Sequence, residues 1–220
     1  MTQKVGAVQA VLWDLDGVVI DSEEDHKKAW QRLARETGKT FSDEQFTATF
    51  GWRNDAIIPV VWGAVSAEEL QELANRKETY YRDYIRQTAA FLPGAQELMR
   101  ALHDEGYLQA LGSSAPIANI ELVKEVLGLE RYMNAFVSGE TVPHGKPAPD
   151  IFLKAAQEVG IEPEHCLVIE DAVAGIAAAH AGGMYSIAVA YGRILPGLQI
   201  ATLVVKDLTE VNVERIQHIA

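Results

Sequence analysis

Six short apolar runs along the chain restrict the folds that it can adopt. They span residues 8–14, 108–113, 135–138, 166–170, 185–190 and 202–205. Patterns typical of amphipathic helices separate most of these runs, with Pro93 near the start of one helix and Gly160 and Gly182 at the ends of two others. Short apolar runs that alternate with helices are typical of a mostly parallel sheet covered on both faces. We therefore predict a doubly wound α/β fold.

A long segment after the first apolar run breaks this alternation and carries helical pattern alone. Two of its stretches open with residues spaced as helix-capping boxes, Ser22 with Asp25 and Ser66 with Glu69. Apolar residues at helical spacing follow in both stretches. The predicted domains are a sheet domain of residues 1–20 and 89–220 and an inserted α-helical cap domain of residues 21–88.

Composition and charge argue against several classes of protein. The 220 residues carry a formal net charge of −12, whereas nucleic-acid binding needs a basic surface. No apolar stretch approaches the roughly 18 residues that a membrane span requires, and the N-terminus lacks the pattern of a signal peptide. The single cysteine, Cys166, lies in the apolar run CLVIE, where we expect a buried thiol. We expect a cytoplasmic monomer or small homo-oligomer without nucleic-acid or membrane partners.

Polar side chains follow several of the predicted strands. In open α/β sheets the chemistry gathers at the carboxyl ends of the strands, so we expect these side chains to share one site. They are Asp14, Asp16, Ser113, Ser114, Lys146, Glu170 and Asp171. Four carboxylates and one lysine leave a large negative excess. A hard divalent cation with oxygen ligands, such as Mg²⁺, would compensate that excess and let a phosphate dianion approach.

This set of groups is suited to phosphoryl transfer. An ionised Asp14 can attack phosphorus and form an acyl-phosphate. Asp16 lies two residues further on and points to the same side, so it can protonate the leaving alkoxide and later activate water. Lys146 and the cation neutralise charge on the transferring group, and the Ser113 hydroxyl can hold its oxygens. The pattern predicts Mg²⁺-dependent phosphoryl transfer through an aspartyl-phosphate.

The stretches DLDGVVIDS, LGSSA, GKPAPD and IEDAVAGIAAAHAGG, in this order and spacing, resemble the four motifs of the haloacid dehalogenase superfamily. The helical insertion after the first motif resembles the C1-capped branch of that family. The resemblance implies a Rossmann-like α/β core and an active site built from these motifs. The roles that it implies are nucleophile for Asp14, acid/base for Asp16, phosphate ligands for Ser113, Ser114 and Lys146, and Mg²⁺ ligands for Asp14, Asp16, Glu170 and Asp171.

Two activities stay open within this resemblance. The stretches DGVVIDSEEDHKKAW and VSAEELQELANRKETYY resemble the β-phosphoglucomutase branch, which implies substrate contacts for His26 and Lys77. That branch grips a second phosphate with a Ser-Lys-Asn signature, whereas residues 114–117 read Ser-Ala-Pro-Ile here. Arg53 and Lys77 are the remaining candidates for holding such a phosphate. We therefore rank hydrolysis of a small phosphorylated metabolite, such as a sugar phosphate, above mutase activity.

Two other classes compete with a phosphoryl-transfer enzyme. A dinucleotide-dependent oxidoreductase shares the sheet architecture, but it needs a Gly-x-Gly-x-x-Gly turn after the first strand, where this chain has Asp-Leu-Asp-Gly-Val-Val. A non-catalytic binding or regulatory protein on the same scaffold is the second alternative, because a fold does not by itself imply a function.

Overall fold

The computed structural model describes residues 8–49, 52–193 and 196–219. The chain forms two compact units, one of Met1–Asp21 with Ala90–Ala220 and one of Ser22–Ala89. They are named the sheet unit and the helical unit below. Each boundary lies one residue further along the chain than the boundary that the sequence suggests.

In the described part of the sheet unit, six parallel strands form one central sheet. The strands are β1 (Ala10–Trp13), β2 (Leu108–Ser113), β3 (Ala135–Ser138), β4 (Cys166–Glu170), β5 (Tyr185–Val189) and β6 (Leu203–Val205). Their order across the sheet is β3-β2-β1-β4-β5-β6. The strand order reverses direction next to β1, as in doubly wound folds, where ligands bind beyond the carboxyl ends of the strands.

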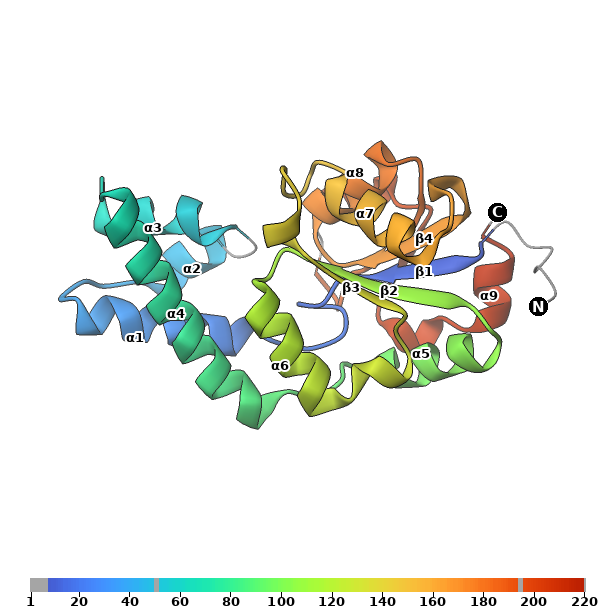
Figure 1. The fold of residues 1–220 in the computed structure, drawn as a ribbon, viewed down its shortest axis with the longest axis horizontal. Helices are drawn as coiled ribbons and strands as arrows, with labels where there is room; N and C mark the ends of the chain where they lie inside the picture. Colours follow the sequence, from blue (N-terminus) through green and yellow to red (C-terminus); the bar gives the residue numbers. More distant parts are fainter. Residues whose placement is uncertain (1–7, 50–51, 194–195, 220) are drawn as a thin grey trace. The chain divides into compact units, whose positions relative to one another are not determined.

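Helices cover both faces of this sheet (Figure 1). They are α5 (Ala95–Asp104), α6 (Ile117–Leu127), α7 (Asp150–Val159), α8 (Val173–Ala181) and α9 (Val213–Gln217). Helices α7 and α8 lie on one face, and α5, α6 and α9 lie on the other. The predicted α/β fold is confirmed. The predicted strands at residues 108–113, 135–138 and 166–170 have the observed bounds, and the other three are shorter than predicted.

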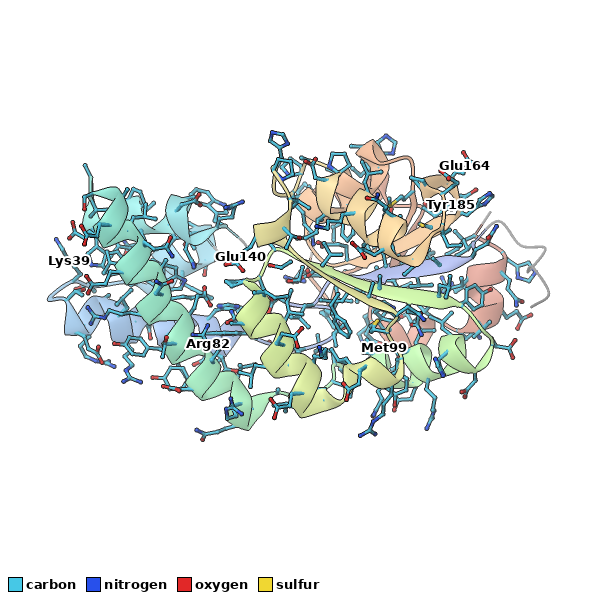
Figure 2. All side chains as sticks on the ribbon, in the orientation of Figure 1. Lys39, Arg82, Met99, Glu140, Glu164 and Tyr185 are labelled. Atoms are coloured by element: carbon cyan, nitrogen blue, oxygen red, sulfur yellow. The ribbon has the colours of Figure 1, made fainter. Side chains whose placement is uncertain are left out.

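The central strands are buried on both faces, which explains their continuous apolar sequence. All four residues of β1 and all five of β4 are buried. Trp13 donates from its indole nitrogen to Gln109 Oε1 at 3.0 Å. Gln109 in turn donates from Nε2 at 2.9 Å to the carbonyl oxygen of Met99, which Figure 2 labels on α5. The buried amide of Gln109 is therefore hydrogen-bonded and links β1 to α5.

Residues 22–49 and 52–89, the described part of the helical unit, form four helices: α1 (Glu23–Glu36), α2 (Asp43–Thr49), α3 (Asn54–Trp62) and α4 (Ala67–Thr88). Ser66 caps α4 as predicted, since its hydroxyl accepts from the Glu69 N–H at 3.2 Å. The capping box predicted at the start of α1 is wrong. Ser22 makes no side-chain cap bond there, and Asp25 instead accepts from the Thr88 hydroxyl at 2.6 Å. A tertiary contact between α1 and α4 thus replaces the local one.

The predicted burial of Cys166 is confirmed, because its side chain is 0% exposed. Burial raises the pKa of this thiol to about 12, so it stays protonated and unreactive at neutral pH. None of the helices in the described part of the chain combines the length and apolar character that a bilayer span requires.

Candidate active site

The turn after β1 presents the first candidate residue, Asp14. Its backbone N–H donates to the carbonyl oxygen of Ile169 at 3.0 Å, which continues the pairing of β1 with β4. The chain then folds back on itself, because Leu15 O accepts from Ile20 N–H at 3.1 Å and Gly17 N–H donates to Ile20 O at 2.8 Å. Asp14 is only 7% exposed, so its carboxylate is fixed in a largely desolvated position.

Gly17 is required in this turn for two reasons. Its φ of +79° is a conformation that L side chains rarely adopt. A Cβ at this position would also lie 2.3 Å from Asp171 Oδ2. The glycine therefore lets the turn after β1 approach the carboxylate that follows β4.

Lys146 joins two of the carboxylates. Its Nζ donates to Asp14 Oδ1 at 2.5 Å and to Glu170 Oε1 at 2.7 Å, and it lies 4.7 Å from the centre of the Phe152 ring. Burial alone lowers the pKa of Lys146, but the charges of Asp14 and Glu170 more than reverse this and raise it above its usual value. The lysine is therefore charged throughout the physiological pH range and compensates part of the acidic cluster.

Glu170 ends β4 and Asp171 follows it. Glu170 uses its second oxygen, Oε2, to accept from the Ala172 N–H at 2.6 Å, just before α8 begins. Gly175 in α8 makes room for this side chain, since a Cβ there would lie 1.8 Å from Glu170 Oε1. Asp171 accepts from Arg193 Nη2 at 2.7 Å through Oδ2.

Three of the predicted metal ligands converge. Asp14, Glu170 and Asp171 are buried, and each offers a carboxylate oxygen within 4.8 Å of the other two. Burial is the largest cause that raises the pKa of Asp14 well above its usual value; Lys146 opposes it, and the other carboxylates, including Asp16, add to it. Burial and Glu170 raise the pKa of Asp171 to about 6 against the opposing charge of Arg193. Crowded carboxylates of this kind match the oxygen ligands that a hard divalent cation prefers.

The two predicted phosphate-binding serines lie at the end of β2. Trp13 of β1 pairs with Leu111 of β2, so the register places Ser113 one residue beyond the level of Asp14, at the same edge of the sheet. Ser113 is buried and its hydroxyl accepts from the Ala115 N–H at 3.1 Å. Ser114 is exposed. The neighbouring strand β3 ends at Ser138. The Ser138 hydroxyl donates to the carbonyl oxygen of Ala115 at 2.7 Å and so fixes the loop that follows β2.

Two of the three candidate substrate residues of the helical unit lie in contact. Lys77 Nζ lies 2.8 Å from His26 Nδ1, and the His26 ring stacks on Tyr81 at 4.0 Å. Lys77 is 2% exposed and also donates to Glu78 Oε1 at 2.8 Å. Arg53, the third candidate, precedes α3 with its side chain 55% exposed and its Nε 3.6 Å from Asp55 Oδ1.

Two charged residues of these clusters were not identified from the sequence. Arg193 binds Asp171 and adds a second cation to the four carboxylates. It stands four residues after the end of β5, so the rule that chemistry gathers beyond strand ends could have identified it. Glu78 compensates Lys77 and also accepts from Asn54 Nδ2 at 2.8 Å. Glu78 directly follows Lys77 in the sequence, and this position could have identified it as the partner of Lys77.

Comparison with known proteins gives consistent matches over most of the chain. A family model described as haloacid dehalogenase-like hydrolase matches residues 8–183. A β-phosphoglucomutase of Bacillus subtilis (strain 168) is 31% identical over 210 residues, 92% of this chain and 92% of that protein. Fructose-1-phosphate phosphatase YqaB of Escherichia coli (strain K12) is 33% identical over 178 residues, 79% of this chain and 92% of that protein. The crystal structure of β-phosphoglucomutase from Clostridium difficile superposes with a TM-score of 0.85 at 27% identity and 96% coverage of both chains.

Proposed function

This chain belongs to the haloacid dehalogenase-like hydrolase family, and we propose that it is a Mg²⁺-dependent phosphatase of small phosphorylated metabolites such as sugar phosphates. The observation that carries the proposal is the contact of Lys146 Nζ with both Asp14 and Glu170 inside a cluster of three buried carboxylates. We expect the enzyme to act in the cytoplasm as a monomer or small homo-oligomer.

Asp14 is the proposed nucleophile. One of its carboxylate oxygens attacks phosphorus, and the bond from phosphorus to the ester oxygen of the substrate breaks. Asp16, two residues further on, gives its proton to the departing alkoxide. It then takes a proton from water, whose oxygen attacks phosphorus and releases inorganic phosphate from Asp14. The same two side chains thus complete both half-reactions, and the net reaction is hydrolysis of the ester.

The remaining residues bind and orient the phosphoryl group. Asp14, Glu170 and Asp171, together with the backbone carbonyl of Asp16, are the groups that would hold Mg²⁺. The cation supplies positive charge that stabilises the negative transferring group. Lys146 holds Asp14 in place and offers a further positive charge to the phosphoryl oxygens. Ser113 and Ser114 are the proposed hydrogen-bonding partners of those oxygens.

Mutase activity is the second candidate, and the similarity to the Bacillus subtilis β-phosphoglucomutase favours it. A mutase must also hold the distal phosphate of a bisphosphate intermediate. Lys77 is a weak candidate for this, because its buried ammonium group is already compensated by Glu78. Arg53 is exposed and paired only at 3.6 Å with the equally exposed Asp55, so it is the better candidate for a distal phosphate. The sequence Ser-Ala-Pro-Ile at residues 114–117, in place of the Ser-Lys-Asn signature of that branch, keeps hydrolysis the first candidate.

The first test is the replacement of the nucleophile. Asp14→Asn should reduce kcat at least about 10³-fold, because an amide cannot form the covalent intermediate. Asp104→Asn, an exposed change at the end of α5, is the matched control and should leave kcat unchanged. Acid quenching of the wild type with ³²P-labelled substrate should leave label on the protein. Full activity in Asp14→Asn would refute the covalent mechanism.

Product analysis separates the two activities. ³¹P NMR of the enzyme with β-glucose 1-phosphate, Mg²⁺ and a trace of glucose 1,6-bisphosphate should show free phosphate if the enzyme is a phosphatase. Glucose 6-phosphate without free phosphate would instead establish the mutase, and Arg53→Ala would then be the first variant to examine. If neither product appears, a panel of small phosphorylated metabolites becomes the test of hydrolysis.

A further inference from the structure

We propose that Arg193 is a positioning residue for Asp171, and that it sets the affinity of the acidic cluster for its divalent cation. This inference rests on the proposed function, because it assigns Asp171 to the metal site. Arg193 lies outside the stretches that resemble the family motifs, in the sequence YGRILPG after β5.

The contact itself is specific. Arg193 Nη2 lies 2.7 Å from Asp171 Oδ2, the distance of a charge-assisted hydrogen bond. The Asp171 side chain is 8% exposed, whereas that of Arg193 is 37% exposed. The buried Asp171 carboxylate is therefore paired with the guanidinium of a partly exposed arginine.

The backbone fixes the place from which Arg193 reaches. Tyr191 N–H donates to Lys206 O at 2.7 Å, which extends the pairing of β5 with β6 past the end of the strand. The chain then turns, and both the N–H and the Nε of Arg193 donate to Ala190 O, at 2.8 and 3.3 Å. Tyr191 adopts a φ of +45° in this turn, which is uncommon for a residue other than glycine. The guanidinium is thus hydrogen-bonded both to the backbone that follows β5 and to Asp171.

Only one oxygen of Asp171 is engaged by this contact. Arg193 binds Oδ2, which is also the Asp171 atom nearest to the position that a Cβ on Gly17 would take. A carboxylate has two oxygens, so this contact leaves Oδ1 to act as a ligand of a metal cation. Hydrogen-bond partners of metal-binding carboxylates fix their orientation, and loss of such a partner typically costs about 10- to 100-fold in metal affinity.

Lys146 and Arg193 together form ion pairs with all three clustered carboxylates. Lys146 binds Asp14 and Glu170, and Arg193 binds Asp171. Each carboxylate of the cluster therefore has one fixed cationic partner. If Arg193 instead competed with the metal for Asp171, its removal would strengthen metal binding, so the sign of the effect separates the two roles.

The test is a Mg²⁺ titration of metal-stripped protein by isothermal titration calorimetry. Arg193→Met should raise the Kd for Mg²⁺ about 10- to 100-fold, and Arg193→Lys should give an intermediate Kd because it keeps the charge but not the planar fork. Arg215→Met is the matched control in the same unit: Arg215 is exposed, donates to Glu210 O at 2.8 Å, and should leave the Kd unchanged. Because Arg193 acts through Asp171, saturating Mg²⁺ should restore kcat in Arg193→Met.

Urea unfolding in EDTA verifies that each variant is folded. If Arg193→Met is not folded, the Kd of Arg193→Lys decides the test. An unchanged or lower Kd for Mg²⁺ in Arg193→Met, while the wild type binds Mg²⁺, overturns the positioning role and leaves the proposed function standing. A wild type that neither binds Mg²⁺ nor depends on it for turnover overturns the proposed function, and this inference with it.

Discussion

Gly175 in α8 leaves the space that the Glu170 side chain occupies, so Gly175→Ala should disrupt the candidate active site. A Cβ at Gly175 would lie 1.8 Å from Glu170 Oε1 and 2.0 Å from Glu170 Cδ. Comfortable contacts between non-bonded heavy atoms are about 3.5–4.0 Å, so the carboxylate has to move by more than about 1.5 Å. It would then lose its hydrogen bonds to Lys146 and to the Ala172 N–H.

The expected magnitude follows from these losses. Overpacking a well-packed interior costs about 1–3 kcal/mol, and each hydrogen bond to a charged group contributes about 1.5–3 kcal/mol. Alanine gains about 1 kcal/mol over glycine inside a helix. The shift of Glu170 relieves the overpacking as it breaks the two hydrogen bonds, so these two costs do not add. Two lost hydrogen bonds, less the helix gain, give a net destabilisation of about 2–5 kcal/mol. At about 2–4 °C per kcal/mol for a chain of this size, the Tm should fall by about 4–20 °C.

Thermal unfolding in EDTA, with and without a subsequent excess of Mg²⁺, measures both consequences of Gly175→Ala. Gly182→Ala is the matched control, because Gly182 ends the same helix with an ordinary backbone and its Cβ would meet Pro149 Cβ at 3.4 Å. The stabilisation by Mg²⁺ should shrink in Gly175→Ala and persist in Gly182→Ala. Equal Tm values and equal Mg²⁺ responses for the two variants would refute the idea that Gly175 positions Glu170.

Three further predictions follow from the buried groups. Gly17→Ala places a Cβ 2.3 Å from Asp171 Oδ2 at a φ of +79°, so calorimetry should show at least about 10-fold weaker Mg²⁺ binding. Burial raises the pKa of Asp171 to about 6, above its unfolded value of 3.8, so the metal-free folded state binds this proton more tightly. Its stability should therefore fall by on the order of 3 kcal/mol as pH rises from about 4 to 6, and urea unfolding of Asp171→Asn in EDTA should lack that part of the decline. Gln109→Leu leaves the buried Trp13 indole N–H without its acceptor and should lower the free energy of unfolding by about 1–3 kcal/mol in urea, whereas an unchanged value would mean that the indole finds another partner.

The sequence was informative where local pattern and topology act together. The runs at residues 108–113 and 166–170, LQALGS and CLVIE, could be located because strands buried on both faces carry mostly apolar side chains. Once the sheet is parallel, the residues after its strands must lie at one edge. That rule alone brings Asp14 to the same edge as Glu170, although they are far apart along the chain.

Contacts between segments that are far apart in the sequence could not be predicted from local pattern. Ser22 and Asp25 have the spacing of a capping box, but Thr88, 63 residues after Asp25, binds the carboxylate that the box would use. The resemblance assigns Lys77 to the substrate, yet in the folded chain its ammonium group is buried against His26 and Glu78. In both cases a partner that only the folded chain supplies decides the role of a polar side chain.

The balance of charge connects the metal with the nucleophile. Asp14, Glu170 and Asp171 carry three negative charges when ionised, and Lys146 and Arg193 supply two positive charges. One negative charge remains while Asp16 carries the proton that it gives to the leaving group, and a substrate phosphate adds up to two more, so a divalent cation offsets more of this excess than a monovalent cation does. Without that cation, burial and the neighbouring carboxylates raise the pKa of Asp14 despite Lys146, and a protonated carboxyl is a poor nucleophile. The divalent cation should therefore lower the pKa of Asp14 and favour its ionised form, so that loss of the cation reduces turnover even when the fold is intact.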